Sequence, residues 1–274
     1  MQVAFLREGR SADFMTSARE HPAARLSKVN AALATGVGRR AAQLAFLVLS
    51  GTFNPVHSQH LHALEIARDV IANLGWYVIG GFLALSNDDY VQRKLGKDSW
   101  PLVRRVELCR LATDDSPWVD VAPWAEFSSY RVTTRLRRAI ESDCRGELQG
   151  RSAIGVEVMG SDTAIRILGK LLQEWEMRGN ATARPWYSER FVCCLVRPGS
   201  NASAEIAQFK AAIQPQVKAM GIKIIVGADE GVNSLQEVSS REIRRAVAMR
   251  HWDELRDSGW LAPRVLNALQ LGQR

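Results

Sequence analysis

Residues 44–61, LAFLVLSGTFNPVHSQHL, are the stretch of sequence that decides the fold. The apolar run Leu44–Leu49 is typical of a strand buried on both faces of a parallel sheet, and Ser-Gly ends it. From Leu61 to Leu74 the apolar residues recur at helical spacing, which predicts a helix. The sequence therefore predicts a strand, a tight loop that contains two histidines, and a helix, in that order.

The loop between this strand and this helix has the composition of a phosphate site. Phosphates bind where strands end and helix N-termini direct free N–H groups outward. Gly51 lets the backbone approach a phosphate closely, while His57 and His60 can add hydrogen bonds or positive charge. We therefore expect a nucleotide site here. His62 has no motif around it, and we expect it at the surface.

A second motif, VSSREIRR, occupies residues 238–245 near the end of the chain. Ser239 or Ser240 can cap a new helix, and Glu242 stands near the capping-box position. The serine hydroxyls, the first N–H groups of the helix and Arg244 can also converge on one anion, because a guanidinium fork suits phosphate oxygens. For this segment alone, both interpretations stay open.

The remaining sequence alternates strands and helices, which predicts an α/β fold. We expect a Rossmann-like, doubly wound parallel sheet with helices on both faces. The expected strands are 44–49, 76–85, 118–121, 154–159, 191–196 and 222–226. The expected helices are 61–74, 101–112, 132–140, 163–172, 202–220, 239–249 and 263–271. The polar segment 173–190 is expected to be a long loop.

The first 43 residues differ from the rest, so we divide the chain into an N-terminal helical extension, 1–43, and an α/β domain, 44–274. Residues 14–33 are rich in Ala and Arg and have weak helical periodicity. Gly36 and Gly38 are expected to break this helix. We expect the extension to pack on the α/β domain.

Composition favours an intracellular protein, cytoplasmic or nuclear, that binds anions. The 274 residues are 46% hydrophobic and carry a formal charge of +7, with a pI near 9.5. Nucleotides, RNA or a membrane surface would each satisfy this charge, so charge alone does not decide between them. The basic residues are dispersed as on a solvated surface, and no nucleic-acid partner is expected. No run approaches the ~20 apolar residues of a membrane span, so no membrane partner is expected either. The four cysteines form no Cys-x-x-Cys pair and read as free thiols. Homo-oligomerisation stays open.

Together, the two motifs resemble the nucleotidylyltransferase superfamily, whose signatures are a His-x-x-His loop after the first strand and an Ile-Ser-Ser-Thr-x-x-Arg helix start. Within it, the chain resembles the nicotinamide or nicotinate mononucleotide adenylyltransferases, in particular divergent eukaryotic, fungal-type members, over roughly residues 44–271. Gln59 stands where Gly is frequent in the family, and Arg241 where Thr is usual. The other similar segments are Asp120–Trp124, Gly160–Asp162, Val196–Gly199 and the helix 101–112 with Arg105.

The resemblance implies an adenylyltransferase that joins ATP to nicotinamide or nicotinate mononucleotide, giving NAD or deamido-NAD and pyrophosphate. The acceptor phosphate attacks the α-phosphate of ATP directly and in line. The implied catalytic residues are His57, His60 and Arg244. The implied ATP-binding residues are Gly51, Thr52, Phe53, Lys94, Lys97, Ser239 and Ser240. The implied acceptor-binding residues are Asn54, Trp124, which would stack on the pyridine ring, Gly160, Asp162 and Arg197, with Trp175 or Trp186 as a second ring contact.

The resemblance also implies that Mg²⁺ arrives with ATP and is held by phosphates and water, with no protein residue as a metal ligand. The expected partners are ATP and a pyridine mononucleotide. One alternative is a cytidylyltransferase, or another nucleotidylyltransferase with a different phosphate acceptor. Another is a nucleotide-binding regulatory or chaperone-like protein that has lost turnover. The sequence leaves the preference between the amide and acid acceptors open.

Overall fold

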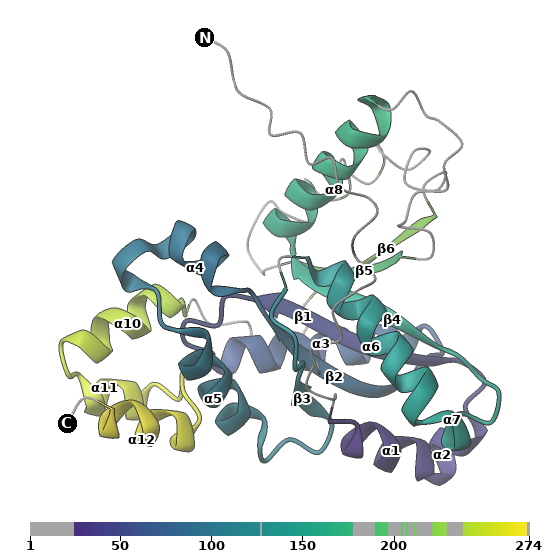
Figure 1. The fold of residues 1–274 in the computed structure, drawn as a ribbon, viewed down its shortest axis with the longest axis horizontal. Coiled ribbons are helices and arrows are strands. Elements are labelled where there is room, and N and C mark those ends of the chain that lie inside the picture. Colours follow the sequence, from purple (N-terminus) through teal and green to yellow (C-terminus); the bar gives the residue numbers. More distant parts are fainter. Residues whose placement is uncertain are drawn as a thin grey trace, which may run out of the picture.

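A six-stranded parallel sheet forms the centre of the molecule (Figure 1). The computed structural model describes residues 25–126, 128–177, 190–196, 221–228 and 238–272, with positions 204, 207 and 211. The strands are β1 (Leu44–Gly51), β2 (Tyr77–Leu85), β3 (Val119–Val121), β4 (Ala153–Gly160), β5 (Arg190–Val196) and β6 (Ile222–Ala228). Every strand pairing is parallel, in the order β3-β2-β1-β4-β5-β6. The predicted Rossmann-like sheet is therefore confirmed.

This strand order places the end of β1 at a topological switch point. From β1 the chain moves outward through β2 and β3, and β4 then lies on the other side of β1. In open α/β sheets, ligands bind outside the carboxyl ends of the strands, where the order reverses. The loop that carries the two histidines leaves β1 at this position.

Helices cover both faces of the sheet (Figure 1). Those before β4 are α1 (Ser27–Ala34), α2 (Gly36–Arg40), α3 (Ser58–Asn73), α4 (Asp88–Leu95), the 3-10 turn η1 (Gly96–Asp98), α5 (Leu102–Thr113), α6 (Ser129–Asp143) and α7 (Arg145–Leu148). Those after β4 are α8 (Ser161–Met177), α10 (Ser240–Ala248), α11 (Trp252–Asp257) and α12 (Pro263–Leu271).

The residues of β1 alternate between two cores, because successive side chains of a strand point to opposite faces. Odd-numbered residues such as Leu47 pack in a core with α3, α5 and α10–α12. Even-numbered residues such as Phe46 pack in a second core with α1, α6 and α7. A third cluster joins β4 and β5 to α8. Burial on both faces explains why β1 reads as an unbroken apolar run.

Four helical segments differ from the sequence expectation. Helix α4 occupies what was expected to be a loop after β2, and Asn87 caps it by accepting a 3.0 Å hydrogen bond from the Tyr90 N–H. Helix α8 extends to Met177, so residues 173–177 are helical rather than part of a long loop. Helices α7 and α11 were not predicted. These segments are polar, so periodicity of apolar residues did not mark them.

The described part of the extension, residues 25–43, packs on the sheet through α1. Leu26, Val29 and Leu33 are buried in the same core as Phe46 of β1. Residues 1–24, which hold the first part of the predicted helix, lie outside the described residues. The division into an extension and a domain stays a prediction.

The predicted break in the helix is observed, because α1 ends at Ala34, but Gly36 and Gly38 then belong to the short helix α2. The Thr35 side chain caps α2 by accepting a 2.9 Å hydrogen bond from the Gly38 N–H. A Cβ on Gly38 would lie 2.2 Å from the Ala32 carbonyl oxygen. Gly38 therefore allows α2 to pack directly on the backbone of α1.

All four cysteines are free and buried: Cys109, Cys144, Cys193 and Cys194. Burial raises the pKa of the Cys144 thiol to about 11 and that of Cys193 to about 12. Thiols with raised pKa values are unreactive packing groups at neutral pH. Among the described helices, none is long and apolar enough to cross a membrane.

Replacing Gly38 with alanine should destabilise the protein by about 1–3 kcal/mol, because the new methyl group meets a backbone carbonyl that cannot rotate away. Urea unfolding would measure this change. Gly36→Ala is the matched control, since its Cβ would meet only the flexible Arg40 guanidinium, at 3.5 Å. That variant should be neutral or up to ~1 kcal/mol more stable, and equal losses for the two variants would contradict the packing explanation.

Candidate active site

The two histidines of the β1–α3 loop hold each other at the start of α3. The backbone N–H of His57 donates to Nδ1 of His60 at 3.1 Å, and the ring centroids are 3.7 Å apart. Because Nδ1 of His60 accepts this bond, the neutral ring carries its proton on Nε2. His57 is the N-cap residue of α3. The pair therefore stands at a helix N-terminus, the place where backbone N–H groups favour an anion.

Phe53 packs under the histidine pair and gives Gly51 a second role. Its ring centroid lies 4.9 Å from that of His60, and Phe53 itself has a left-handed φ of 43°. A Cβ on Gly51 would lie 3.0 Å from the Phe53 ring. Gly51 therefore makes room for the aromatic ring, whereas its close approach to a phosphate stays a prediction.

The late motif lies directly against this loop. The Ser240 hydroxyl donates to the Pro55 carbonyl at 2.9 Å, and the Arg244 Nη1 group donates to the Asn54 carbonyl at 2.6 Å. Ser239 caps α10 in a capping box with Glu242, as one of the two interpretations expected. The loop after the first strand and the helix after the last strand thus meet at the switch point.

Asn54 is used inside the protein. Its side chain is fully buried, donates through Nδ2 to the Asp98 carbonyl at 2.7 Å, and accepts from the Trp100 N–H at 2.9 Å. These bonds fix the segment between α4 and α5 against the histidine loop. Asn54 is therefore a positioning residue in this structure, and direct contact with the acceptor stays a prediction.

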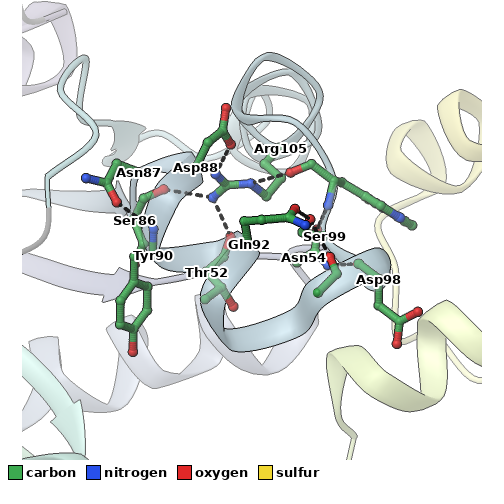
Figure 2. Close-up of polar contacts among 12 residues, drawn as sticks. Thr52, Asn54, Ser86, Asn87, Asp88, Tyr90, Gln92, Asp98, Ser99 and Arg105 are labelled. Carbon is green, nitrogen blue, oxygen red and sulfur yellow. Dashed lines mark hydrogen bonds and ion pairs between the residues drawn. The ribbon is translucent and has the colours of Figure 1, made fainter.

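Arg105 anchors the same edge of the sheet and is completely buried (Figure 2). Its guanidinium donates at 2.9 Å to each of three carbonyl oxygens, those of Thr52, Ser86 and Trp100. It also forms a 2.8 Å ion pair with the Asp88 carboxylate. One side chain therefore joins the ends of β1 and β2, the start of α4 and the start of α5. The sequence matched Arg105 to a family pattern but gave no sign of this role.

A cavity of about 340 Å³ opens next to the histidine loop, between α4, α6 and α8. Gly51 and Thr52 line it at the end of β1, and Lys94 lines it from α4. Its volume falls in the range of small-molecule sites, ~300–1,000 Å³. Its hydroxyl lining comes from Ser50, Thr52, Ser86, Tyr90, Ser128, Ser129 and Thr163.

A buried ion pair forms part of the same wall and was not foreseen. Glu157 in the middle of β4 is 1% exposed and binds Arg190 of β5 through both carboxylate oxygens. The Ser129 hydroxyl also donates to Glu157. A lone Glu within an apolar strand was the available signal, because a buried carboxylate needs a cationic or hydrogen-bonding partner.

The remaining predicted site residues either are absent from the described lining of the cavity, as are Trp124, Lys97 and Gly160, or lie outside the described part. Trp124 is half-buried, and the Arg135 guanidinium lies 5.7 Å from its ring centroid, so one face is already covered. Lys97 lies exposed in η1. Gly160 ends β4 at the carboxyl edge. Arg197, Trp186 and the side chains of Asp162 and Trp175 lie outside the described residues.

The electrostatics of the loop favour neutral histidine and charged arginine. Desolvation of the ring, and then the neighbouring His57, hold the pKa of His60 well below its ordinary value of 6.5. Desolvation also lowers the pKa of Arg244, which the Asp98 carboxylate partly offsets. An arginine stays charged despite such a shift. At neutral pH the site therefore presents an imidazole N–H donor beside a guanidinium cation.

Comparison with known proteins gives matches to the family that the two sequence motifs resemble. A family model described as cytidylyltransferase-like matches residues 48–255. The nicotinamide/nicotinic acid mononucleotide adenylyltransferase of Oryza sativa subsp. japonica is 32% identical over 137 residues, which cover 47% of this chain and 53% of that protein. The Arabidopsis thaliana protein of the same name is 36% identical over 97 residues, 35% of this chain and 39% of that protein.

These matches are partial, since the chain spans about half the length of the curated relatives or less. A solved structure of Thermotoga maritima TmcAL bound with alpha-thio ATP aligns at a TM-score of 0.37 and 18% identity, over 83% of this chain and 55% of that chain. That alignment carries no functional argument here.

Arg105→Lys should destabilise the protein by about 3–5 kcal/mol, because a lysine cannot satisfy the separated carbonyls and leaves a charge buried without them. Urea unfolding of the purified variant measures this loss. The neighbouring Arg104→Lys is the control, as Arg104 is partly exposed and bonds to Glu107 and the Ala268 carbonyl. It should cost less than about 1 kcal/mol. Similar losses for both variants would show that Arg105 is not an anchor.

His60 should make the protein less stable as the pH falls. Its pKa is lower in the folded chain than the ordinary 6.5, so below that pH unfolding takes up a proton and the free energy of unfolding decreases. The slope added by this one group is at most about 1.4 kcal/mol per pH unit. His60→Asn keeps an acceptor for the His57 N–H but removes the titrating ring, so it should flatten the decline in urea titrations between neutral and acidic pH.

His251→Asn, an exposed position at the start of α11, is the control for this experiment, because it removes a histidine outside the loop. If the free energy of unfolding of the His60 variant depends on pH as that of the wild type does, the lowered pKa of His60 is contradicted.

Proposed function

This chain belongs to the cytidylyltransferase-like family, and from that premise we propose that it is an adenylyltransferase that joins ATP to a pyridine mononucleotide. The products are NAD or deamido-NAD and pyrophosphate. The observation that carries the proposal is the contact of the late Ser-Arg motif with the histidine loop, through Ser240 with Pro55 and Arg244 with Asn54. The names of the curated relatives support the choice of acceptor.

The proposed reaction is a single displacement at the α-phosphorus of ATP. An oxygen of the acceptor's 5′-phosphate forms a bond to this phosphorus. The bond from the phosphorus to the bridging oxygen of the β-phosphate breaks, and pyrophosphate leaves with that electron pair. No covalent enzyme intermediate is needed, so catalysis consists of positioning and of stabilising negative charge.

The histidine loop supplies that stabilisation in our proposal. The N–H groups at the start of α3, with the Nε2–H of neutral His60, would donate to the α-phosphate and its neighbours. Neutral histidine suits this role, because a donor is required and no proton needs to be removed from a phosphate acceptor. His57 contributes by holding the His60 ring through its backbone N–H.

The late motif would hold the leaving pyrophosphate. Within the described residues, the hydrogen bonds of Arg244 engage Nη1 only, to the Asn54 and Ser240 carbonyls. Its Nε and Nη2 groups can therefore bind phosphate oxygens as a fork. Ser239 and Ser240 stand at the N-terminus of α10, which adds a second helix end to the site. Lys94 and Lys97, on α4 and η1, would add charge to the triphosphate.

We propose that Mg²⁺ enters as part of the ATP substrate. In the described part of the chain, no group of three or more His, Cys, Asp or Glu residues is placed to hold a metal. Phosphate oxygens and water suit this ion, which loses its hydration reluctantly. The metal would neutralise charge on the phosphates, while the chain's own residues orient them.

Incubation of the purified protein with ATP, Mg²⁺ and each pyridine mononucleotide should yield a dinucleotide and pyrophosphate, measured by chromatography. His60→Ala should lower kcat about 10²–10³-fold, the effect of removing one donor from developing charge. His62→Ala, two residues further along α3, is the control and should retain activity.

The absence of a dinucleotide from either acceptor would reject the proposal. CTP then tests the alternative of cytidylyl transfer: stabilisation of the protein by CTP in preference to ATP would favour it. If His60→Ala abolishes turnover while ATP still binds, a purely regulatory role is also excluded.

A further inference from the structure

The cavity beside the histidine loop has a strongly positive lining. Its cationic side chains are Lys94, Arg166, Lys170 and Arg190, and no Asp or Glu appears among the described residues that line it. The chain gathers these cations from α4, α8 and β5, which are far apart in sequence. A concave surface lined by one sign of charge attracts ligands of the other sign.

The four cations are not equivalent. The carboxylate of Glu157 neutralises Arg190 through two hydrogen bonds. Lys94, Arg166 and Lys170 form no salt bridge with another described residue, in contrast to Arg105 or Arg190. Three charges of this cavity are therefore available to a ligand.

These three charges occupy two walls. Lys94 extends from α4, next to Tyr90, whereas Arg166 and Lys170 stand one helical turn apart on the same side of α8. In the reaction proposed above, the acceptor's phosphate must lie at the Gly51–Thr52 end of the cavity, because that end joins the histidine loop. Lys94 is already assigned to the triphosphate of ATP. The α8 pair then faces another part of the acceptor.

We propose that the α8 pair selects an acceptor with a second anionic group, a carboxylate on its ring, so that the protein uses nicotinate mononucleotide in preference to nicotinamide mononucleotide. This inference rests on the proposed function. A carboxylate accepts two hydrogen bonds from an arginine fork, and a nearby lysine adds charge. A carboxamide is neutral, and its NH₂ group is a donor that gains nothing from cations. The selection therefore depends on charge as well as on contact.

The experiment compares kcat/KM for the two acceptors at fixed ATP and Mg²⁺, at low salt. The wild-type protein should favour the acid about tenfold or more, as one charge-assisted pair allows. Arg166→Gln with Lys170→Gln should remove this preference by lowering kcat/KM for the acid, while kcat/KM for the amide stays within about twofold. Raising the salt concentration should narrow the wild-type preference, because both side chains are exposed.

Two controls keep the comparison sharp. Arg166→Lys with wild-type Lys170 retains the charge and should keep most of the preference. Arg138→Gln removes an exposed arginine from α6 that does not line the cavity. This variant should leave kcat/KM unchanged for both acceptors. Thermal unfolding of each variant shows whether the fold is retained, as expected for exposed positions on helices.

The outcomes separate this inference from the proposed function. Equal kcat/KM for both acceptors in the wild-type protein would overturn the selection by α8, and so would an equal loss of kcat/KM for both in the double variant. Either result is still consistent with the proposed adenylyltransferase activity. A preference for the amide also overturns the selection by α8. If neither acceptor gives a dinucleotide, the proposed function fails, and the inference fails with it.

Discussion

The buried guanidinium of Arg105 is the interaction on which the functional edge of this protein depends. A charge without solvent is costly, and here the cost is offset by three carbonyl oxygens and the Asp88 carboxylate (Figure 2). These acceptors come from the ends of two strands and the starts of two helices. Strand ends in a parallel sheet leave carbonyl groups that lack strand partners, and one planar fork satisfies several of them at once.

The histidine loop is built on this anchor and is held from a second side by the C-terminal helices. Arg105 occupies the Thr52 carbonyl, Arg244 the Asn54 carbonyl and Ser240 the Pro55 carbonyl. Three carbonyl oxygens of the loop thus accept hydrogen bonds from side chains of the protein. A loop held in this way can present N–H groups to an anion without reorganising, which is how positioned dipoles stabilise charge most effectively.

The sequence predicted the sheet well, because its physical signals are local. Strands such as β1 are buried on both faces, so they appear as unbroken apolar runs, and Pro263 at the first turn of α12 marked that helix at the bounds observed. It predicted α4 and α11 poorly, since their residues are mainly polar and carry no apolar stripe. Gly36 and Gly38 marked the break after α1 but not the helix α2 that contains them: glycine is a helix breaker by local preference, but α1 requires a residue without a side chain at Gly38.

The sequence by itself determined the fold class, the histidine loop at the first strand end and the Ser-Arg helix start, because each is a short pattern whose chemistry can be read from adjacent residues. Only the tertiary structure decided that Asn54 serves the α4–α5 segment, that Arg105 binds the Thr52 carbonyl, and that Lys94, Arg166 and Lys170 surround one cavity. These depend on which strand lies next to which and on where a helix axis points. Long-range contacts of this kind are set by the packing of the whole core, and no local pattern records them.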